Sequence, residues 1–156
     1  MTRSLAAAAV LGLAAFPASP EAQSTSADAP LAVVQRLFDA MRGRDTAAMR
    51  ALFDPNARLM TTTTRNGQPV LRTSSVEEWL GVVGGATVEL DERIWDPSVE
   101  VDDRLATVWV KYELMVDGRF SHCGVDAFQL FQGAAGWVIF QVADTRRREN
   151  CRRQPT

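Results

Sequence analysis

The second half of the chain alternates apolar and polar residues with a period of two, a pattern typical of half-buried β-strands. It predicts a long strand over residues 87–101 that is interrupted near Pro97, because proline cannot donate a hydrogen bond to a central ladder. Further strands are predicted over residues 104–116, 119–131 and 137–144. The short connections between these strands favour an antiparallel meander.

The first half of the chain repeats apolar residues at helical spacing instead. One helix is predicted along the stripe of Leu31, Val34, Phe38 and Met41, and a second, shorter helix follows with Asp45 as its N-cap. The helical half of the chain therefore precedes the strand-rich half.

A small hairpin and a third helix are predicted between these two halves. A threonine-rich strand over residues 58–64 turns back at Asn66-Gly67. Ser75 and Glu78 then have the spacing of a capping box at the start of a helix. Helices followed by a run of strands indicate an α+β fold, with the N-terminal helices packed on a curved antiparallel or mixed sheet.

The dipeptide Asp117-Gly118 separates two alternating runs and predicts a hairpin with a two-residue loop. This loop length pairs Glu113 with His122, the only histidine of the chain, and Trp109 with Asp126. Directly opposed residues have Cβ atoms about 5 Å apart, so a carboxylate would lie beside the imidazole. The carboxylate would raise the pKa of His122 and let the imidazole move protons near neutral pH. A structural ion pair at a pocket rim is the alternative interpretation.

The same register divides the residues between two faces of the sheet. We expect the face that carries Phe128 and Phe140 to pack against the helices, and to become polar at its other end. Apolar walls with a few converging polar groups are typical of small-molecule pockets. The opposite face would pack against a second subunit and carries Val108, Val110, Tyr112 and Leu114. The reverse assignment of the two faces stays open.

The predicted site has a catalytic set and a set of pocket walls. The catalytic candidates are His122, Glu113 and Asp126. The pocket candidates are long or aromatic side chains, namely Trp79, Trp109, Lys111, Phe128 and Phe140. Core packing without ligand chemistry is the alternative role for the aromatic residues. One histidine and two distant cysteines form no metal-ligand set with recognisable spacing, so no metal or other cofactor is expected.

The N-terminus has the pattern of a signal peptide over residues 1–24. Arg3 precedes an apolar run over residues 5–16, which is shorter than the roughly 20 residues that cross a bilayer. Small residues then precede the expected cleavage after Ser24. We therefore expect a periplasmic or secreted protein without a membrane span in its mature form, with a membrane anchor as the alternative.

The rest of the 156 residues predicts a single domain. A polar linker over residues 25–29 precedes the domain over residues 30–145, and an arginine-rich tail over residues 146–156 follows it. The formal net charge of −2 argues against general nucleic-acid binding.

The two cysteines, Cys123 and Cys151, both lie in the expected mature chain. An even number of cysteines in an exported protein favours a disulfide, which would tie the C-terminal tail to the sheet. Two free thiols or a bridge between subunits are the alternatives.

Several short sequence segments resemble those of the nuclear transport factor 2-like (NTF2-like) superfamily, which includes ketosteroid isomerases and polyketide-cyclase-like proteins. They are residues 34–40 (VQRLFDA), 49–57 (MRALFDPNA) and 136–139 (GWVI). Within the superfamily the chain resembles exported bacterial proteins described as "putative lumazine-binding". The resemblance covers residues 30–145 and implies a cone-shaped α+β fold, a pocket between sheet and helices, and a homodimer.

No active site of that superfamily carries over directly. Its isomerases use a tyrosine in the site, whereas the predicted register places Tyr112 on the outer face. Its dehydratases use histidine with acids, for which His122 with Asp126 or Glu113 is the nearest match. A fold alone does not specify a function.

Three functions remain open from the sequence. The first is an exported protein that binds a small, partly apolar molecule without catalysis. The second is a lyase or isomerase with His122 as the acid or base. The third is a homodimeric interaction module, joined through the outer sheet face, that binds no ligand.

Overall fold

The computed structural model describes residues 27–151. The predicted signal peptide and its cleavage site lie outside the described residues, as do the start of the linker and the last five residues of the tail. The first helix begins at Asp28, two residues before the expected start of the domain.

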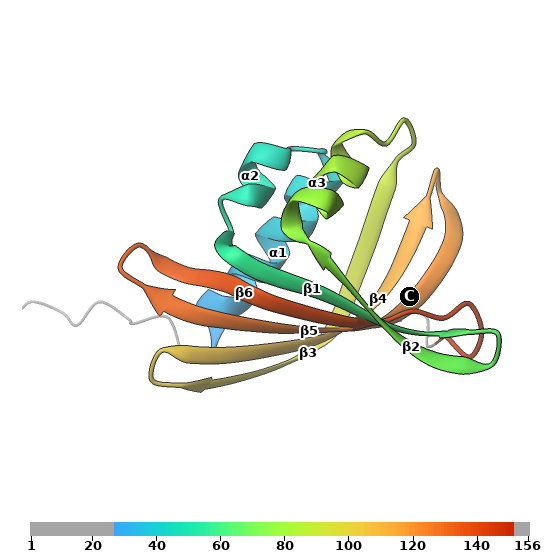
Figure 1. Ribbon diagram of the computed structural model, residues 1–156. Helices are drawn as coiled ribbons and strands as arrows, with labels where there is room; N and C mark the ends of the chain where they lie inside the picture. The colour runs from blue at the N-terminus through green and yellow to red at the C-terminus, as the bar shows by residue number, and fades with distance from the viewer. Residues whose placement is uncertain (1–26, 152–156) are drawn as a thin grey trace, which may run out of the picture.

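The described residues form three helices and one six-stranded sheet (Figure 1). The helices are α1 (Asp28–Arg42), α2 (Thr46–Arg50) and α3 (Val76–Gly84). The strands are β1 (Phe53–Arg65), β2 (Gln68–Ser75), β3 (Leu90–Asp102), β4 (Leu105–Val116), β5 (Arg119–Gly133) and β6 (Gly136–Thr145). They lie in the order β2-β1-β6-β5-β4-β3, with β1 and β6 parallel and all other neighbours antiparallel. The prediction of an α+β fold with helices on a mixed sheet is confirmed.

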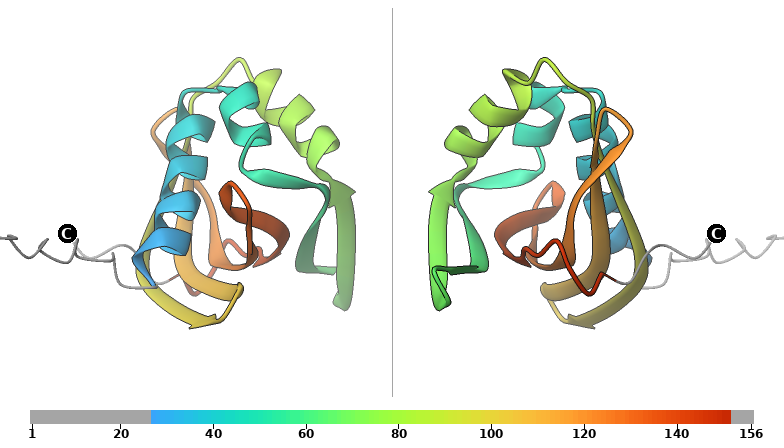
Figure 2. Two further views of the ribbon diagram at one scale, coloured as in Figure 1. Left: turned by 90° about the vertical axis from the view of Figure 1, so that its left-hand side faces the viewer. Right: turned by 90° about the vertical axis from the view of Figure 1, so that its right-hand side faces the viewer.

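The sheet curves around the helices, which cover its concave face (Figure 2). Helix α1 contacts β3, β4 and β6, whereas α3 contacts β1 and β2. The two longer helices therefore stand over different parts of the sheet.

Helix α1 faces the sheet with the apolar stripe that its sequence predicts. Its buried residues are Pro30, Val33, Val34, Leu37, Phe38 and Met41. The ring of Phe38 meets the edge of Phe128 on β5, with the ring centroids 5.9 Å apart. Burial of such a side chain stabilises the fold by roughly 1.5–3 kcal/mol, so this contact anchors α1 to the centre of the sheet.

The predicted caps of the other two helices are confirmed. The Asp45 side chain accepts a hydrogen bond from the Ala48 backbone N–H at 2.9 Å. Ser75 Oγ accepts from the Glu78 N–H at 3.2 Å, and the Glu78 carboxylate accepts from the Ser75 N–H at 2.9 Å. Both helices therefore begin where the local sequence supplies partners for backbone donors that lack one within the helix.

The hairpin at Asp117-Gly118 forms, and both turn residues have the positive φ that a type I′ turn requires (48° and 70°). The register predicted beyond the turn is wrong. Ser121 opposes no residue of β4, so a β-bulge shifts the pairing by one residue. Glu113 consequently pairs with Cys123 rather than with His122.

A shift of one residue exchanges the two faces of β4 relative to β5, because side chains alternate along a strand. The concave face therefore carries Val108, Val110 and Tyr112 together with His122, Asp126 and Phe128. Trp109, Lys111 and Glu113 lie on the other side of the sheet. The expectation that Tyr112 lies outside and these three residues inside is wrong.

A second bulge changes the last hairpin in the same way. Phe131 pairs with Val138, and Phe140 opposes no residue of β5. Ile139, which is fully buried, takes the core position that was expected for Phe140. Phe140 instead packs beside the partly exposed Phe131, with ring centroids 6.3 Å apart.

Candidate functional site

A cavity of about 510 Å³ lies between the concave face of the sheet and helices α1 and α3. Its apolar walls are formed by Leu37, Phe38, Leu59, Trp79, Phe128 and Val142. Its polar end is formed by Glu92, Tyr112, Asp126, Asp144 and Arg146. The cavity is therefore apolar where the helices cover the sheet and polar beyond them.

Strand pairing places three carboxyl groups at the polar end. Asp126 on β5 and Asp144 on β6 are direct cross-strand partners. Glu92 comes from β3 and lies opposite Leu114, which in turn pairs with His122. The three acids thus come from three strands and share the concave side of the sheet.

Glu92 and Asp126 interact most closely. A hydrogen bond joins their side chains. Burial raises the pKa of Glu92 to about 7. The pKa of Asp126 is raised well above its usual value by burial and by the charges of Glu92 and Asp144. Their hydrogen bond lowers the pKa of Glu92 and raises that of Asp126, so Asp126 is the member of the pair that holds the shared proton.

Asp126 also has an oxygen without a partner. The residue is only 5% exposed and its Oδ2 atom is fully buried, yet this atom makes no hydrogen bond with any described residue. A buried polar atom without a hydrogen bond costs about 1–3 kcal/mol. Because Asp126 lines the cavity, a bound molecule could supply the missing donor.

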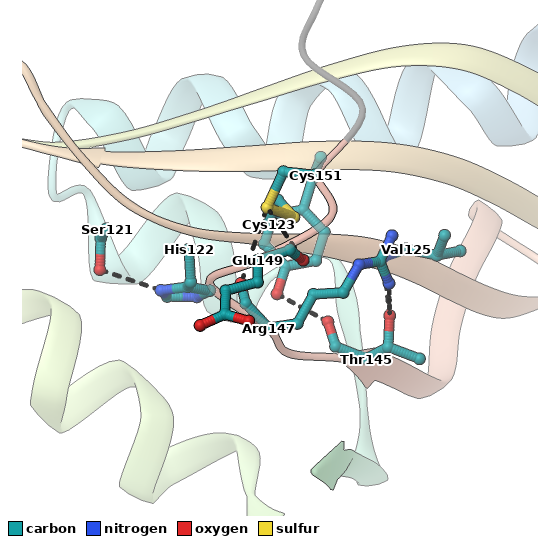
Figure 3. Close-up of a disulfide and its surroundings, with 9 residues drawn as sticks. Ser121, His122, Cys123, Val125, Thr145, Arg147, Glu149 and Cys151 are labelled. Carbon is teal, nitrogen blue, oxygen red and sulfur yellow. Dashed lines mark hydrogen bonds between the residues drawn. A yellow bond between two sulfur atoms is a disulfide. The ribbon is translucent and has the colours of Figure 1, made fainter. Parts of the chain in front are cut away.

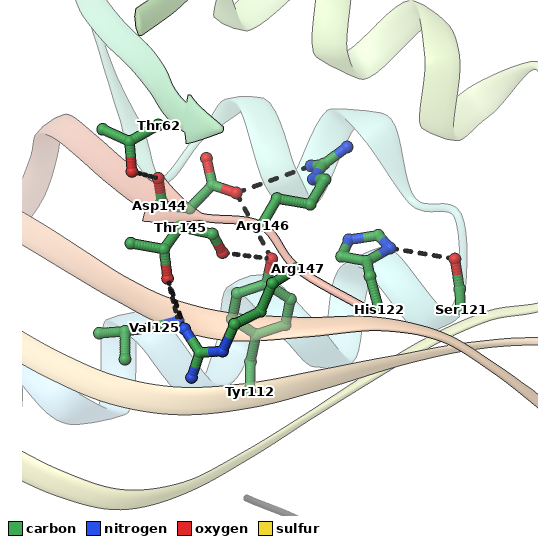
Figure 4. A network of polar contacts seen from close by, with 9 residues as sticks. All are labelled: Thr62, Tyr112, Ser121, His122, Val125, Asp144, Thr145, Arg146 and Arg147. Atoms are coloured by element: carbon green, nitrogen blue, oxygen red, sulfur yellow. Dashed lines mark hydrogen bonds and ion pairs between the residues drawn. The ribbon is translucent and has the colours of Figure 1, made fainter. Parts of the chain in front are cut away.

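The single tyrosine, Tyr112, lines the polar end of the cavity, with its hydroxyl beside Asp144 and Thr145 (Figure 4). The Tyr112 hydroxyl donates to the Thr145 carbonyl oxygen at 3.0 Å and lies 3.4 Å from Asp144 Oδ2. Burial and the acids around it raise the pKa of Tyr112 above its usual value, so the hydroxyl stays neutral. It is therefore a fixed hydrogen-bond donor.

A glycine lets the end of β6 cross over this tyrosine. A Cβ atom on Gly124 would lie 1.8 Å from the Thr145 carbonyl oxygen and 2.7 Å from the Tyr112 ring. Only the absence of a side chain permits this approach. Gly124 therefore determines where the last residues of β6 enter the site.

Arg146 supplies the positive charge of the polar end. Its guanidinium lies 3.7 Å from Asp144 and is 52% exposed, so the pair stands at the cavity mouth (Figure 4). The Arg146 backbone N–H donates to the Thr62 carbonyl, and the Thr62 hydroxyl donates to the Asp144 carbonyl. These bonds hold the segment against β1.

The histidine lies beside this cluster but has a different partner from the one predicted. Its Nδ1 is 3.0 Å from Ser121 Oγ, and its ring meets the Tyr112 ring edge-on at 5.8 Å. Burial, with smaller contributions from Arg146 and Arg148, lowers the pKa of His122 to about 4. The imidazole is therefore neutral at physiological pH.

The sequence model of the family described as "Putative lumazine-binding" matches residues 25–142. The chain belongs to this family. A comparison with curated proteins finds no match.

Solved structures share the fold of this family member. An NTF2-like protein from Cytophaga hutchinsonii is 13% identical, with a TM-score of 0.62 over 77% of this chain and 97% of that one. The beta subunit of a "putative aromatic-ring-hydroxylating dioxygenase" from Novosphingobium aromaticivorans is 10% identical, with a TM-score of 0.64 over 78% and 88%. At such identities the likeness establishes the NTF2-like fold alone.

The cavity of this family member includes some predicted site residues and excludes others. Asp126, Trp79 and Phe128 line it. Trp109 is 51% exposed on the outer face, where Lys111 forms an ion pair with Asp96. Phe140 lies outside the cavity, and Glu113 is buried on the side of the sheet opposite His122.

Sequence reasoning missed two of the central residues, Tyr112 and Glu92. Tyr112 was assigned to the wrong face, and Glu92 lies in a strand whose pairing was not predicted. One signal for the inner face of β4 was available in the sequence. The alternating set with Val108, Val110 and Tyr112 is more apolar than the set with Trp109, Lys111 and Glu113, and the more apolar set is expected to face the core.

The predicted disulfide joins Cys123 and Cys151 (Figure 3). Two backbone hydrogen bonds between Cys123 and Arg147, at 2.9 and 3.0 Å, continue the pairing of β5 with the tail. A bridge across 28 residues stabilises by about 3.6 kcal/mol in the chain-entropy account. It also holds the segment that carries Arg146 at the cavity mouth.

Within residues 27–151, no group of three or more His, Cys, Asp or Glu side chains has the arrangement of a metal site. None of the helices in this part of the chain has the length and apolar character needed to cross a bilayer.

Proposed function

We propose that this protein binds a small, partly apolar molecule in the cavity between its sheet and its helices. The observation that carries the proposal is one 510 Å³ space with apolar walls at one end and converging acids and a tyrosine at the other. Such a combination is typical of ligand sites, because apolar walls supply burial while a few polar groups fix orientation. The family description, which names a flat bicyclic heterocycle, supports a ligand of this size.

The apolar body of the ligand would contact Phe128, Trp79 and Val142, and its polar group would meet Asp126. Replacing Val142 by tryptophan would fill the space between these walls. The adjacent Gln141 pairs with Gln129 on the opposite side of the sheet, so Gln141→Trp adds the same side chain outside the cavity.

The test is native mass spectrometry of the protein purified from its natural host. We expect a bound small molecule in the wild type and in Gln141→Trp, and its loss in Val142→Trp. An empty wild-type protein that also binds nothing in a broad compound screen would contradict the proposal. Retention of the molecule by Val142→Trp would contradict this location.

A second candidate is an enzyme that moves protons, of the lyase or isomerase class. The pKa of Glu92, about 7, favours it, because a general acid or base works best near the ambient pH. His122 as the acid or base is less well supported, since its pKa of about 4 leaves it unprotonated. NMR-detected deuterium exchange at the α-carbon of 2-tetralone would test this activity, with Glu92→Gln and His122→Gln identifying the responsible group.

We further propose that the protein is exported after removal of residues 1–24. The disulfide between Cys123 and Cys151 supports this location, because such bonds persist in oxidising compartments. Intact-mass measurement of the protein from periplasmic or culture fractions should give a chain that begins at Thr25. A full-length mass in those fractions would contradict the cleavage.

A homodimer through the outer sheet face is the last part of the proposal. Exposed Trp109 and the partly exposed Phe131 lie on this face and support an apolar contact. Sedimentation equilibrium should show a dimer that Trp109→Asp dissociates. Leu71→Asp, at an exposed position on β2, should leave it intact. A monomeric wild type at high concentration would contradict the dimer.

A further inference from the structure

The polar end of the cavity contains more acidic than basic side chains. Glu92, Asp126 and Asp144 are acids, whereas Arg146 is the only cation that the described cavity lining places beside them. Arg146 lies against Asp144 and is half exposed. Its charge also acts on Glu92 and Asp126, but it lowers their pKa values less than burial raises them. Among the described residues, no cation forms a salt bridge with Glu92 or Asp126, so the pair is only weakly compensated.

The other charged groups around the pair cancel or are neutral. Tyr112 and His122 are both neutral at pH 7. At the outer rim of the cavity, Arg72 and Glu78 contribute one charge of each sign.

Charges also face Glu92 from the side of α1. A smaller cavity there shares Glu92 with the larger one. Its two cations, Arg42 and Arg93, both bond to Asp91, at 2.9 and 2.7 Å, and Arg42 also contacts Asp39. These arginines are therefore neutralised by other acids.

The unpartnered Oδ2 of Asp126 shows what kind of group is missing. It can accept a hydrogen bond, no described residue donates one, and the residue lines the cavity. The Tyr112 hydroxyl donates its single proton to the Thr145 carbonyl, with Asp144 Oδ2 3.4 Å away, so it is not free to fill this position. A ligand that brings both an N–H donor and a positive charge would satisfy the oxygen and balance the pair.

We propose that the cavity binds a protonated amine carried on an apolar body, with the amine donating hydrogen bonds to Asp126 beside Glu92. This inference rests on the proposed small-molecule binding and specifies the class of ligand. The apolar body lies against Phe128 and Trp79. The ammonium group displaces the proton that the two carboxyl groups share, so binding is linked to proton release.

The test uses matched compounds that differ in the charge of one group. Tryptamine, N-acetyltryptamine and indole-3-propionate form one series, and the corresponding phenethyl compounds form another. Isothermal titration at pH 5, 6.5 and 8 measures their affinities. Primary alkylamines stay protonated up to about pH 10, so any change in amine affinity over this range reports on the protein.

The expected result is that an amine binds at least tenfold more tightly than its neutral and anionic counterparts, and that its affinity rises from pH 5 to pH 8. Asp126→Asn should lower amine affinity at least tenfold and flatten the pH dependence. Asp103→Asn, in the exposed turn before β4, should change neither.

Two outcomes would overturn the amine proposal while leaving small-molecule binding intact. One is a neutral or anionic compound that binds as tightly as its amine counterpart. The other is identification of a neutral or anionic molecule by native mass spectrometry. Failure of every amine to bind at millimolar concentration would also overturn it, and an empty native protein in addition would remove the proposed function.

Discussion

The concave face of the sheet has an apolar half and a polar half, although the same strands form both. The boundary runs between Phe128 and Asp126 on β5 and between Val142 and Asp144 on β6. On the apolar side, side chains are buried against helices. On the polar side, acids face a cavity and one carboxylate oxygen has no partner. The first arrangement stabilises the fold, whereas the second lowers its stability, as expected if the polar half is the proposed ligand site.

The largest expected effect lies in the apolar half. Leu130 is fully buried there, and Leu130→Ala should lower the free energy of unfolding by about 3 kcal/mol through lost burial and a cavity. Its neighbour Phe131 faces the other side and is 36% exposed, so Phe131→Ala should cost about 1 kcal/mol or less. Urea unfolding measures both. Equal costs would show that the apolar half is not the core.

The junction between the two halves depends on a backbone crossing. Gly124→Ala would push the Thr145 carbonyl away from the sheet, at a cost of about 1–3 kcal/mol, and would displace Arg146. Gly81→Ala is the matched control, because a Cβ there meets nothing within 4 Å and alanine favours helix α3 by up to about 1 kcal/mol. Opposite signs are expected for the two variants in thermal unfolding. A tolerated Gly124→Ala would refute the crossing.

The two halves also differ in how far sequence predicts them. Helix stripes, the capping box at Ser75 and the turn at Asp117-Gly118 are local signals, and the structure confirms each of them. The face of β4 depends on its register with β5, and the bulge at Ser121 has no marker in the local sequence. A two-residue loop fixes a register only as far as the first bulge.

The composition of β4 was a better guide than the hairpin register to which of its two faces is buried. The set with Val108 and Val110 is more apolar than the set with Trp109 and Lys111, and the structure buries the apolar set. The hairpin rule outweighed this difference in the prediction. The full carboxyl cluster was beyond sequence reasoning, because it assembles from three strands whose relative registers contain three irregularities.

The pH dependence of stability should separate the groups of the polar half. The folded pKa of Glu92, about 7, lies above its usual 4.5, so the folded protein holds a proton that the unfolded chain releases. The free energy of unfolding should therefore fall as the pH rises from 4.5 to 7, by on the order of 1–3 kcal/mol. His122 contributes to the pH dependence in the opposite direction. Its folded pKa of about 4 lies below the usual 6.5, so the free energy of unfolding falls as the pH falls from 6.5 to 4.

Urea titrations at several pH values can resolve these two contributions. Glu92→Gln should reduce the loss of stability above pH 5, and Asp126, whose pKa is also raised, should account for the rest. His122→Gln should remove the loss on the acidic side. A wild-type profile that Glu92→Gln leaves unchanged would mean that Glu92 is ionised in the folded protein at pH 5.

The smallest expected effect tests whether the polar half really sacrifices stability. Asp126→Asn keeps the shape of the side chain, removes the group whose ionisation burial opposes, and adds an amide donor that Asp144 or Glu92 can accept. At pH 8 the variant should be about 1 kcal/mol more stable than the wild type, while binding of the ligand weakens. Thermal unfolding and ligand titration of the same preparation measure both quantities. A variant that loses stability and keeps its ligand would instead place Asp126 with the structural core, and the boundary between the two halves would lie further along β5.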